Sequence, residues 1–324
     1  MKSNIFDQLR PYFERLEGHM SRYYASNIPF INEISGHILF AGGKKIRPLL
    51  AVFSAKLCGL NTDGKVYDLA LIPEYLHAAS LLHDDVVDGG KLRRGKPSAY
   101  EIWGNQGTVL AGDFLYAKAI ELATRFSDIR IARTIAETVE LMSEGEVLQL
   151  LHAKEPNFDE KTYLDIIYRK TTALISASCK IGAVFAGGDD KEISALSDYG
   201  FYLGQAFQMI DDLLDYTADS GELGKAIGTD LAEGKLTLPL VAGLEMAAGA
   251  EKERLLLILK KKGHTKEELD WVRDLLDTTG AFRYTRQKAE GLIEAGCGIL
   301  DIFKPSWERD VLKGLARFVI ERRK

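Results

Sequence analysis

The sequence predicts an all-α protein. The chain has 324 residues, is 46% hydrophobic and contains only 8 prolines. Long stretches rich in alanine, leucine, glutamate and lysine place apolar residues three and four positions apart, which is the spacing of a buried helix face. No run of alternating, β-branched residues indicates a strand. We therefore expect a single domain over residues 1–324, folded as a bundle of roughly 10–15 helices.

The periodicity predicts helices along the whole chain, and no glycine- and serine-rich linker separates two halves. In order, the predicted helices cover residues 3–24, 28–41, 45–59, 66–90, 106–126, 128–152, 159–187, 191–217, 236–247, 251–261, 266–277, 281–303 and 306–323. Pro73 falls inside a periodic segment. Either the helix kinks at this proline or it begins near it.

Composition excludes several classes of protein. The net charge of −5 argues against a general nucleic-acid binder. The three cysteines are odd in number and lack metal-ligand spacing, as expected for buried thiols in a reducing cytoplasm. The N-terminus lacks the apolar core of a secretory signal, and no run of about 18 apolar residues could span a membrane. We therefore expect a cytoplasmic protein.

Two clusters of aspartates each follow an apolar helical run. The first acidic cluster is Asp84, Asp85 and Asp88, and the second acidic cluster is Asp211, Asp212 and Asp215. In each cluster the first and last aspartates are four residues apart and share a helix face, where like charges repel. Carboxylates at the edge of a core need cations, protons or hydrogen bonds.

The clusters have the chemistry of a magnesium site. Oxygen ligands without histidine spacing suit a hard cation, above all Mg²⁺, which takes one or two carboxylates together with substrate phosphates. A single cluster of this kind could equally be a solvated acidic face. Two clusters, each ending an apolar helix run, favour metal binding.

Basic residues near the first acidic cluster predict binding of a second anion. Arg93 and Arg94 follow that cluster, and "GGKKIRP" contributes Lys44 and Arg47 near a predicted helix start. Arginine matches phosphate oxygens with two hydrogen bonds, and helix N-termini bind phosphates. Each basic pair alone could be a solvated surface. Together with the acidic clusters, the pattern indicates one diphosphate held through Mg²⁺ and another held directly by cations.

Further candidates lie before and after the clusters. His77 precedes the first cluster, where it could contact an anion. Lys170 and Thr171 fall at an expected helix break, and Gln208 lies three residues before the second cluster. The segment from residue 217 to residue 235 is rich in glycine, as is typical of a mobile loop that approaches a ligand.

Taken together, these residues resemble the trans-type polyprenyl diphosphate synthases, and most closely the long-chain, octaprenyl type. The resemblance rests on "GGKKIRP", "LLHDDVVDGGKLRRGKPS", "AGDFL", "EGEVLQL", "RKTTAL", "GQAFQMIDDLLD" and "KAIGTDLAEGK", in this order. It implies the isoprenoid synthase fold, an all-α bundle around a deep central cavity, and a homodimer. It also implies Mg²⁺-dependent, head-to-tail condensation of isopentenyl diphosphate with an allylic diphosphate.

The resemblance also implies roles for individual residues. Asp84, Asp88 and Asp211 would ligate Mg²⁺, typically three ions, with Asp85, Asp212 and Asp215 supporting them. Arg93, Lys170 and Lys225 would hold the allylic diphosphate, with Lys235 close by, and Lys44, Arg47, His77 and Arg94 would hold isopentenyl diphosphate. Thr171 and Gln208 would line the reacting centre. Lys45 stands where arginine is commoner in the family, and Glu146 departs from the glutamine of short-chain members.

Small side chains before the first acidic cluster predict a long product. Ser80 and Ala79 lie four and five residues before Asp84, about one helical turn away, and Leu76 lies a turn further. Short-chain relatives usually place phenylalanine or tyrosine at the first two positions. We expect a product of about six to ten isoprene units (C30–C50), with octaprenyl near the centre, since one turn is roughly the length of one unit. The alternative is tight helix packing at small residues and a short-chain farnesyl or geranylgeranyl diphosphate synthase.

Two other functions fit the sequence less well. A class I terpene cyclase usually mixes asparagine, serine or threonine and glutamate in its second metal site, and has no use for "GGKKIRP". A non-catalytic subunit of the same fold would be expected to lose carboxylates or basic contacts, and none is missing here. A long hydrocarbon product also makes transient membrane contact plausible during release, although no basic amphipathic anchor is evident.

Overall fold

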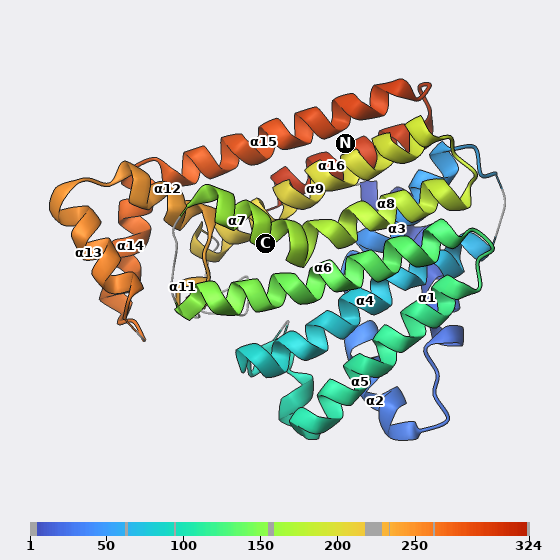
Figure 1. Ribbon diagram of the computed structural model, residues 1–324, viewed down its shortest axis with the longest axis horizontal. Helices are drawn as coiled ribbons and strands as arrows, with labels where there is room; N and C mark the ends of the chain where they lie inside the picture. Colours follow the sequence, from blue (N-terminus) through green and yellow to red (C-terminus); the bar gives the residue numbers. More distant parts are fainter. Residues whose placement is uncertain are drawn as a thin grey trace. The chain divides into compact units, whose positions relative to one another are not determined.

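The structure is a computed structural model that describes residues 5–61, 64–93, 95–154, 159–217, 229–232, 234–261 and 263–322. Helices make up most of these residues, which confirms the predicted all-α class (Figure 1). Among the described residues, no helix has both the length and the apolar character needed to cross a bilayer.

The helices follow the predicted order closely. They are α1 (Ile5–Tyr23), α2 (Pro29–Leu39), α3 (Ile46–Leu57), α4 (Lys65–Asp88), α5 (Ala99–Thr124), α6 (Ile129–Lys154), α7 (Glu160–Ile167), η1 (Tyr168–Thr172), α8 (Ala173–Phe185), α9 (Asp190–Thr217), α11 (Thr229–Ala232), α12 (Leu238–Met246), α13 (Gly249–Leu259), α14 (Lys266–Thr278), α15 (Ala281–Ile299), η2 (Leu300–Ile302) and α16 (Trp307–Glu321). Two short strands, β1 (Leu92–Arg93) and β2 (Lys96–Pro97), pair antiparallel.

The chain divides into two compact units that are interleaved in sequence. The first unit comprises Met1–Glu140, Leu174–Phe201 and Cys297–Ala316, and the second comprises Leu141–Ala173, Tyr202–Gly296 and Arg317–Lys324. Each unit is described by itself below. The expectation of a single domain over residues 1–324 stays a prediction.

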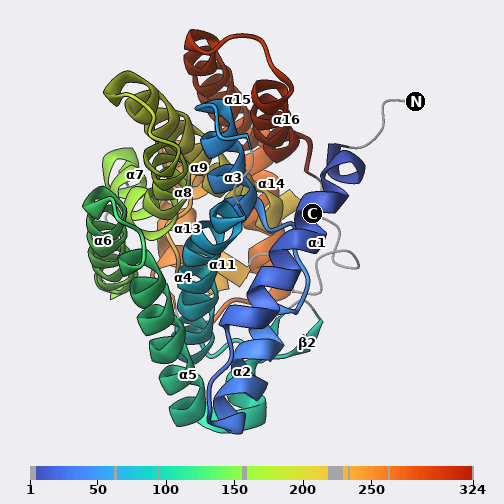
Figure 2. The same cartoon turned by 90° about the vertical axis from the view of Figure 1, so that its right-hand side faces the viewer.

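In the first unit, α4 is the central helix. It packs against α5, which runs beside it (Figure 2), and also against α1, α2 and α3. Most of its length is buried, including Leu69, Ile72 and Leu76. The helix begins at Lys65 and continues through Pro73, so the alternative of a helix starting near the proline is wrong. Burial on several sides outweighs the one backbone hydrogen bond that proline removes.

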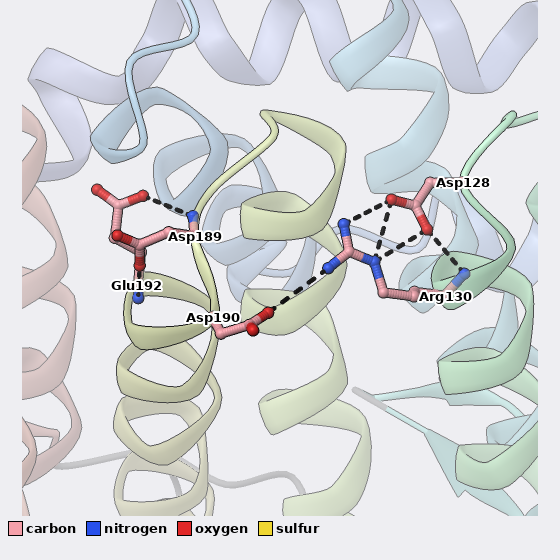
Figure 3. Close-up of polar contacts among 5 residues, drawn as sticks. All are labelled: Asp128, Arg130, Asp189, Asp190 and Glu192. Carbon is pink, nitrogen blue, oxygen red and sulfur yellow. Dashed lines mark hydrogen bonds and ion pairs between the residues drawn. The ribbon is translucent and has the colours of Figure 1, made fainter.

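The N-terminus of α9 and that of α6 are capped by acidic side chains in the first unit (Figure 3). Asp189 and Glu192 exchange hydrogen bonds with each other's backbone N–H groups, at 3.0 and 2.8 Å. The carboxylate of Asp128 accepts from the backbone N–H of Arg130 at 2.9 Å. The guanidinium of Arg130 then bridges Asp128 to Asp190, at 2.7 and 4.0 Å. These caps define where the two long helices start.

In the second unit, α12 packs against α7, α13 and α14. Its core includes Leu240, Leu255, Val272 and Leu276, all at most 1% exposed. A Cβ atom at Gly243 would lie 2.2 Å from Leu276, so glycine permits the close approach of α12 and α14. Figure 1 shows α13 and α14 as a pair of helices following α12.

Three local features differ from the sequence prediction. The predicted helix 159–187 is interrupted by the π-helical turn η1, at the break expected near Lys170 and Thr171, but the turn is π-helical, which the sequence did not indicate. The backbone of Gly204 comes so close to η1 that a Cβ would lie 2.8 Å from the Cα of Thr172. The predicted helix 106–126 begins earlier, at Ala99, and bends at Gly104, whose φ is 75°. The β1–β2 hairpin was not predicted, because two-residue strands leave no periodicity to detect.

Candidate active site

The first acidic cluster lies at the C-terminal end of α4, in the first unit. Asp85 is 4% exposed, Asp84 is half-buried and Asp88 is exposed. Gly89 follows with a left-handed φ of 65° and ends the helix. The three aspartates lie together at the end of a buried helix, as the sequence predicts. Their solvent exposure increases from Asp85 through Asp84 to Asp88.

Arg93 is bound to the buried aspartate of this cluster. Its Nε donates to both carboxylate oxygens of Asp85, at 2.9 and 3.1 Å, and an Nη atom lies 2.7 Å from Oδ1. The antiparallel pair β1–β2 carries Arg93 back toward the helix end. Asp85 therefore orients the guanidinium, which was predicted to hold a diphosphate. Arg94 lies outside the described residues.

The glycine-rich loop before α3 carries the other predicted anion ligands of the first unit. Gly42 and Gly43 have left-handed φ angles of 84° and 115°. Lys44 is exposed, with Nζ 5.9 Å from the ring centroid of Phe6, and Arg47 is half-buried in the first turn of α3. His77 is half-buried on α4, against which α3 packs. The predicted helix start next to these basic residues is confirmed.

The second acidic cluster lies in the last two turns of α9, in the second unit. Each of its aspartates has a different partner. Oδ1 of Asp211 lies 2.7 Å from the guanidinium of Arg322, and Oδ2 of Asp215 accepts from the backbone N–H of Asp230 at 3.1 Å. Asp212 is 4% exposed and belongs to a hydrogen-bond network.

That network joins α7, η1 and α9 within the second unit. Thr171 Oγ1 donates to Gln208 Oε1 at 2.8 Å, and Gln208 Nε2 donates to Asp212 Oδ1 at 2.9 Å. The hydroxyl of Tyr163 donates to Asp212 Oδ2 at 2.7 Å. The structure thus brings together three of the predicted site residues, Thr171, Gln208 and Asp212, and adds Tyr163.

Burial dominates the electrostatics of Asp212. Burial and, to a smaller extent, the negative charge of Asp230 raise the pKa of the carboxyl to about 8, although the hydrogen bonds from Gln208 and Tyr163 act in the opposite direction. Burial and the carboxylate of Asp212 also raise the pKa of the Tyr163 hydroxyl well above its usual value. Asp212 is therefore a hydrogen-bonded support of α9, distinct from the more exposed Asp211.

Lysines predicted to bind the allylic diphosphate also have acidic partners. Lys170 Nζ lies 2.8 Å from Glu146, and Lys235 Nζ lies 3.9 Å from Asp230. Lys170 belongs to η1, and single π-helical turns occur frequently at functional sites. Lys225 and most of the predicted mobile loop lie outside the described residues.

Three side chains of the second unit were missed by the sequence interpretation: Tyr163, Asp230 and Arg322. A buried carboxylate requires a hydrogen-bond donor. The need for a donor such as Tyr163 could therefore be inferred only after Asp212 was known to be buried. Asp230 stands within "KAIGTDLAEGK", so its position in a quoted motif was available. Arg322 follows α16, 111 residues from Asp211, and no local spacing indicates this contact.

The three predicted chain-length residues lie on the buried part of α4. Leu76 and Ala79 are fully buried, and Ser80 is half-buried with its hydroxyl donating to the carbonyl of His77 at 2.9 Å. A cavity of about 440 Å³ lies at the other end of the same helix, beside Lys65 and Asp68.

The comparison with protein families gives a match to polyprenyl synthetase over residues 28–276, most of the chain. The chain belongs to the polyprenyl synthetase family. Prenyltransferase is accordingly its enzyme class, since this is the class of the family. The resemblance inferred from the motifs is therefore confirmed.

Similar proteins of the polyprenyl synthetase family differ in the product that they are named for. Octaprenyl diphosphate synthase of Escherichia coli is 38% identical over 297 residues, covering 92% of this chain and 91% of the relative. Short chain isoprenyl diphosphate synthase of Methanothermobacter thermautotrophicus is 36% identical over 323 residues, covering 98% of each. Identity of this order shows the family without deciding the product length.

A solved polyprenyl synthase confirms the fold. The crystal structure of the Caulobacter crescentus enzyme, complexed with calcium and isoprenyl diphosphate, matches with a TM-score of 0.93 and 36% identity. The match covers 99% of this chain and 98% of that chain. A divalent cation and an isoprenyl diphosphate are thus ligands of a close structural relative.

Proposed function

We propose that this chain is a trans-polyprenyl diphosphate synthase that condenses isopentenyl diphosphate, head to tail, with an allylic diphosphate. The proposal rests mainly on one observation. In each unit a helix ends in a cluster of three aspartates, and an arginine side chain contacts one aspartate of the cluster. Arg93 binds Asp85 in the first unit, and Arg322 binds Asp211 in the second. This chemistry suits a metal-bound diphosphate, for which carboxylates supply metal ligands and guanidinium groups supply phosphate contacts.

The donor set fits Mg²⁺. Asp84, Asp88 and Asp211 offer carboxylate oxygens that are neither fully buried nor fully enclosed by protein. Among the residues that the structure describes, no three acidic, histidine or cysteine side chains already form a metal site. Mg²⁺ commonly takes only one or two carboxylates and completes its coordination with water and phosphate oxygens. We propose that these three aspartates hold Mg²⁺, three ions per active site, when diphosphate is bound.

The proposed mechanism follows from the charges of the side chains. Arg93, Lys170, Lys225 and Lys235 bind the allylic diphosphate and stabilise the negative charge that it gains as its carbon–oxygen bond breaks. When bound, Mg²⁺ neutralises part of the same charge. Asp85, Asp212 and Asp215 orient the residues around them through hydrogen bonds.

The second substrate is held by a separate basic set. Lys44, Arg47, His77 and Arg94 bind the diphosphate of isopentenyl diphosphate and place its double bond next to the allylic cation. Thr171 and Gln208 line the reacting centre. Attack by the double bond forms the new carbon–carbon bond, and the proton then lost passes to the released diphosphate, the strongest nearby base. Water must be excluded while the cation exists, because it would quench the cation.

A long product is supported by the small side chains on α4. Leu76, Ala79 and Ser80 put no aromatic ring below the first acidic cluster. No ring therefore blocks the first turns before Asp84, and one helical turn is roughly the length of one isoprene unit. We therefore propose a C30–C50 product, with octaprenyl diphosphate near the centre. A short-chain farnesyl or geranylgeranyl product is the alternative.

A homodimer is proposed from the outer face of α5. Val109, Leu110 and Ile120 are 36%, 64% and 46% exposed. Val109 and Ile120 share one face of α5, about three turns apart, and Leu110 lies beside Val109. A second copy of this chain would cover this apolar stripe, as the family resemblance implies. Analytical ultracentrifugation should show a dimer, and Leu110→Lys should shift the population toward monomer.

The proposed location is the cytoplasm, with transient membrane contact during product release and no role in binding nucleic acid. Absence of binding to liposomes, both with and without bound product, would count against the membrane contact.

One assay tests the main proposal. The purified chain alone should incorporate isopentenyl diphosphate into an allylic primer when Mg²⁺ is present, and chromatography of the products should show C30–C50 chains. A cyclic hydrocarbon made from one diphosphate would indicate a terpene cyclase. No incorporation by a folded chain would indicate a non-catalytic subunit.

A further inference from the structure

The backbone of Lys45 is held in an unusual conformation. Among the residues that the structure describes, Lys45 is the one non-glycine residue with a left-handed backbone, at φ 42° and ψ 43°. Lysine adopts this conformation only where the surrounding structure enforces it, because its Cβ approaches the following carbonyl oxygen. Such strained residues cluster at functional sites, and Lys45 directly precedes α3 at the end of the glycine-rich loop.

Two short hydrogen bonds hold the side chain of Lys45. Its Nζ donates to Oε1 of Glu74 at 2.7 Å and to the backbone carbonyl of Leu39, also at 2.7 Å. The side chains of Lys45 and Glu74 are only 11% and 10% exposed. Lys45 therefore differs from its exposed neighbour Lys44, because its charge is directed into the protein.

These bonds tie three helices together within the first unit. Leu39 is the last residue of α2, where carbonyl groups lack partners within the helix, and a lysine there also interacts favourably with the helix dipole. Lys45 is the residue before α3, and Glu74 lies in the middle of α4. The bridge therefore fixes the loop at one point against both neighbouring helices.

The bridge also fixes the spacing of the proposed ligands of isopentenyl diphosphate. Glu74 lies three residues before His77, so the two side chains share a face of α4. Lys44 and Arg47 lie one and two residues from Lys45. A displacement of the loop away from Glu74 would move both basic side chains relative to His77.

We propose that Lys45 is a positioning residue for isopentenyl diphosphate. Its bridge to Glu74 and Leu39 holds the strained loop in the arrangement in which Lys44, Arg47 and His77 bind one diphosphate together. The proposal rests on the proposed function and adds a residue that acts through others, without contact with substrate.

The test separates the two substrates. Removing one partner of a buried ion pair leaves the other charge uncompensated, so the informative variant is the double substitution Lys45→Met/Glu74→Gln. It should raise the KM for isopentenyl diphosphate by about tenfold or more, with the KM for the allylic diphosphate within about twofold and kcat largely kept. Calorimetric titration with isopentenyl diphosphate alone should show the same loss of affinity.

Two further variants distinguish the side chain from the backbone. Lys45→Arg keeps the charge and should retain the wild-type KM. Lys45→Gly, combined with Glu74→Gln so that no buried charge is left unpaired, relieves the left-handed strain and removes the bridge, so it should also raise the KM for isopentenyl diphosphate. A wild-type KM in the glycine variant would overturn the proposal, because the backbone conformation alone would then suffice. An equal rise in both KM values would overturn it too, by indicating a general structural defect.

A matched control lies in the last turn of α3, the helix that Lys45 precedes. Lys56 pairs with Glu308 at 3.9 Å and has no proposed substrate contact, so Lys56→Met should leave both KM values unchanged. If the wild-type chain incorporates no isopentenyl diphosphate at all, the proposed function fails. If it is active and the double variant keeps its affinity, only the positioning role of Lys45 fails.

Discussion

The guanidinium of Arg322 lies 2.7 Å from Oδ1 of Asp211, and it also stacks 4.7 Å from the ring centroid of Phe207, one turn earlier on α9. The ion pair joins the segment after α16 to the carboxylate proposed to bind Mg²⁺. A cation that binds Asp211 must compete with this arginine. Arg322 is therefore expected to affect the binding of Mg²⁺ at Asp211.

Arg322→Gln should therefore lower the Mg²⁺ concentration needed for half-maximal activity. A partly exposed ion pair contributes up to about 1 kcal/mol, so the shift should be about two- to fivefold. Mg²⁺ titrations of activity and of binding measure it. The control is Arg317→Gln, an exposed arginine on α16. An unchanged midpoint in Arg322→Gln would show that the ion pair does not oppose metal binding.

Asp84→Ala and Asp211→Ala should each lower kcat by about 100-fold or more, because each removes a proposed ligand of the ion that stabilises the leaving diphosphate. Steady-state kinetics measure the loss, and circular dichroism melting confirms that each variant is folded. Asp274→Ala, an exposed aspartate on α14, is the control and should keep wild-type activity. Near-normal turnover in folded Asp84→Ala would contradict the metal assignment.

Glu146→Gln should strengthen binding of the allylic diphosphate. Glu146 holds Lys170 at 2.8 Å, and both side chains are partly exposed, at 33% and 21%. Without this carboxylate, Lys170 is available to the substrate, and the KM for the allylic diphosphate should fall by about two- to fivefold. Glu144→Gln is the control, since Glu144 pairs with Arg169 instead. A rise in KM would show that Glu146 positions Lys170 for the substrate.

Glu160 should make folding stability depend on pH in the acid range. Burial alone would raise the pKa of its carboxyl, but hydrogen bonds from Lys288 and Tyr284 lower it below its usual value. A carboxyl whose pKa is lower in the folded than in the unfolded state stabilises the folded protein. This stabilisation is complete at pH values above the unfolded pKa of about 4.3 and is lost as the pH falls through the folded pKa. Glu160→Gln should lower the free energy of unfolding at pH 7 by roughly 1–3 kcal/mol.

Urea unfolding at pH 7 and at acid pH measures this effect. In Glu160→Gln the loss should shrink as the pH falls, because the wild-type protein then loses the same interaction. A difference between the two proteins that is constant over the whole range would contradict the assignment of the lowered pKa to Glu160.

An aromatic ring below the first acidic cluster should shorten the product. Ala79→Tyr or Ser80→Phe should stop chain growth at about three or four units, one helical turn below the aspartates, with the chemical step intact. Ala79 is fully buried and Ser80 is half-buried, so Ser80→Phe is the safer variant against overpacking. Chromatography gives the product length. If both variants make the wild-type product, the growing chain does not pass these residues.

The sequence by itself determined the helical class, most helix positions and the residues with the chemistry of a diphosphate site. These properties are local. A 3.6-residue period, a glycine at a helix end and aspartates four residues apart are visible without knowledge of distant segments. The acidic clusters at the ends of α4 and α9, and the basic residues beside the start of α3, were therefore predicted correctly in position.

Only the tertiary structure decided which partners these side chains have. The sequence showed Lys45 only as one basic residue of "GGKKIRP", whereas the structure shows that Glu74, 29 residues away, holds it inside the protein. Asp212 was expected to support the metal ligands, but its burial and its hydrogen bond from Tyr163 are visible only in the structure, as is the contact of Asp211 with Arg322. Hydrogen bonds and desolvation depend on contacts between segments remote in sequence, and the spacing of residues along a helix carries no information about them.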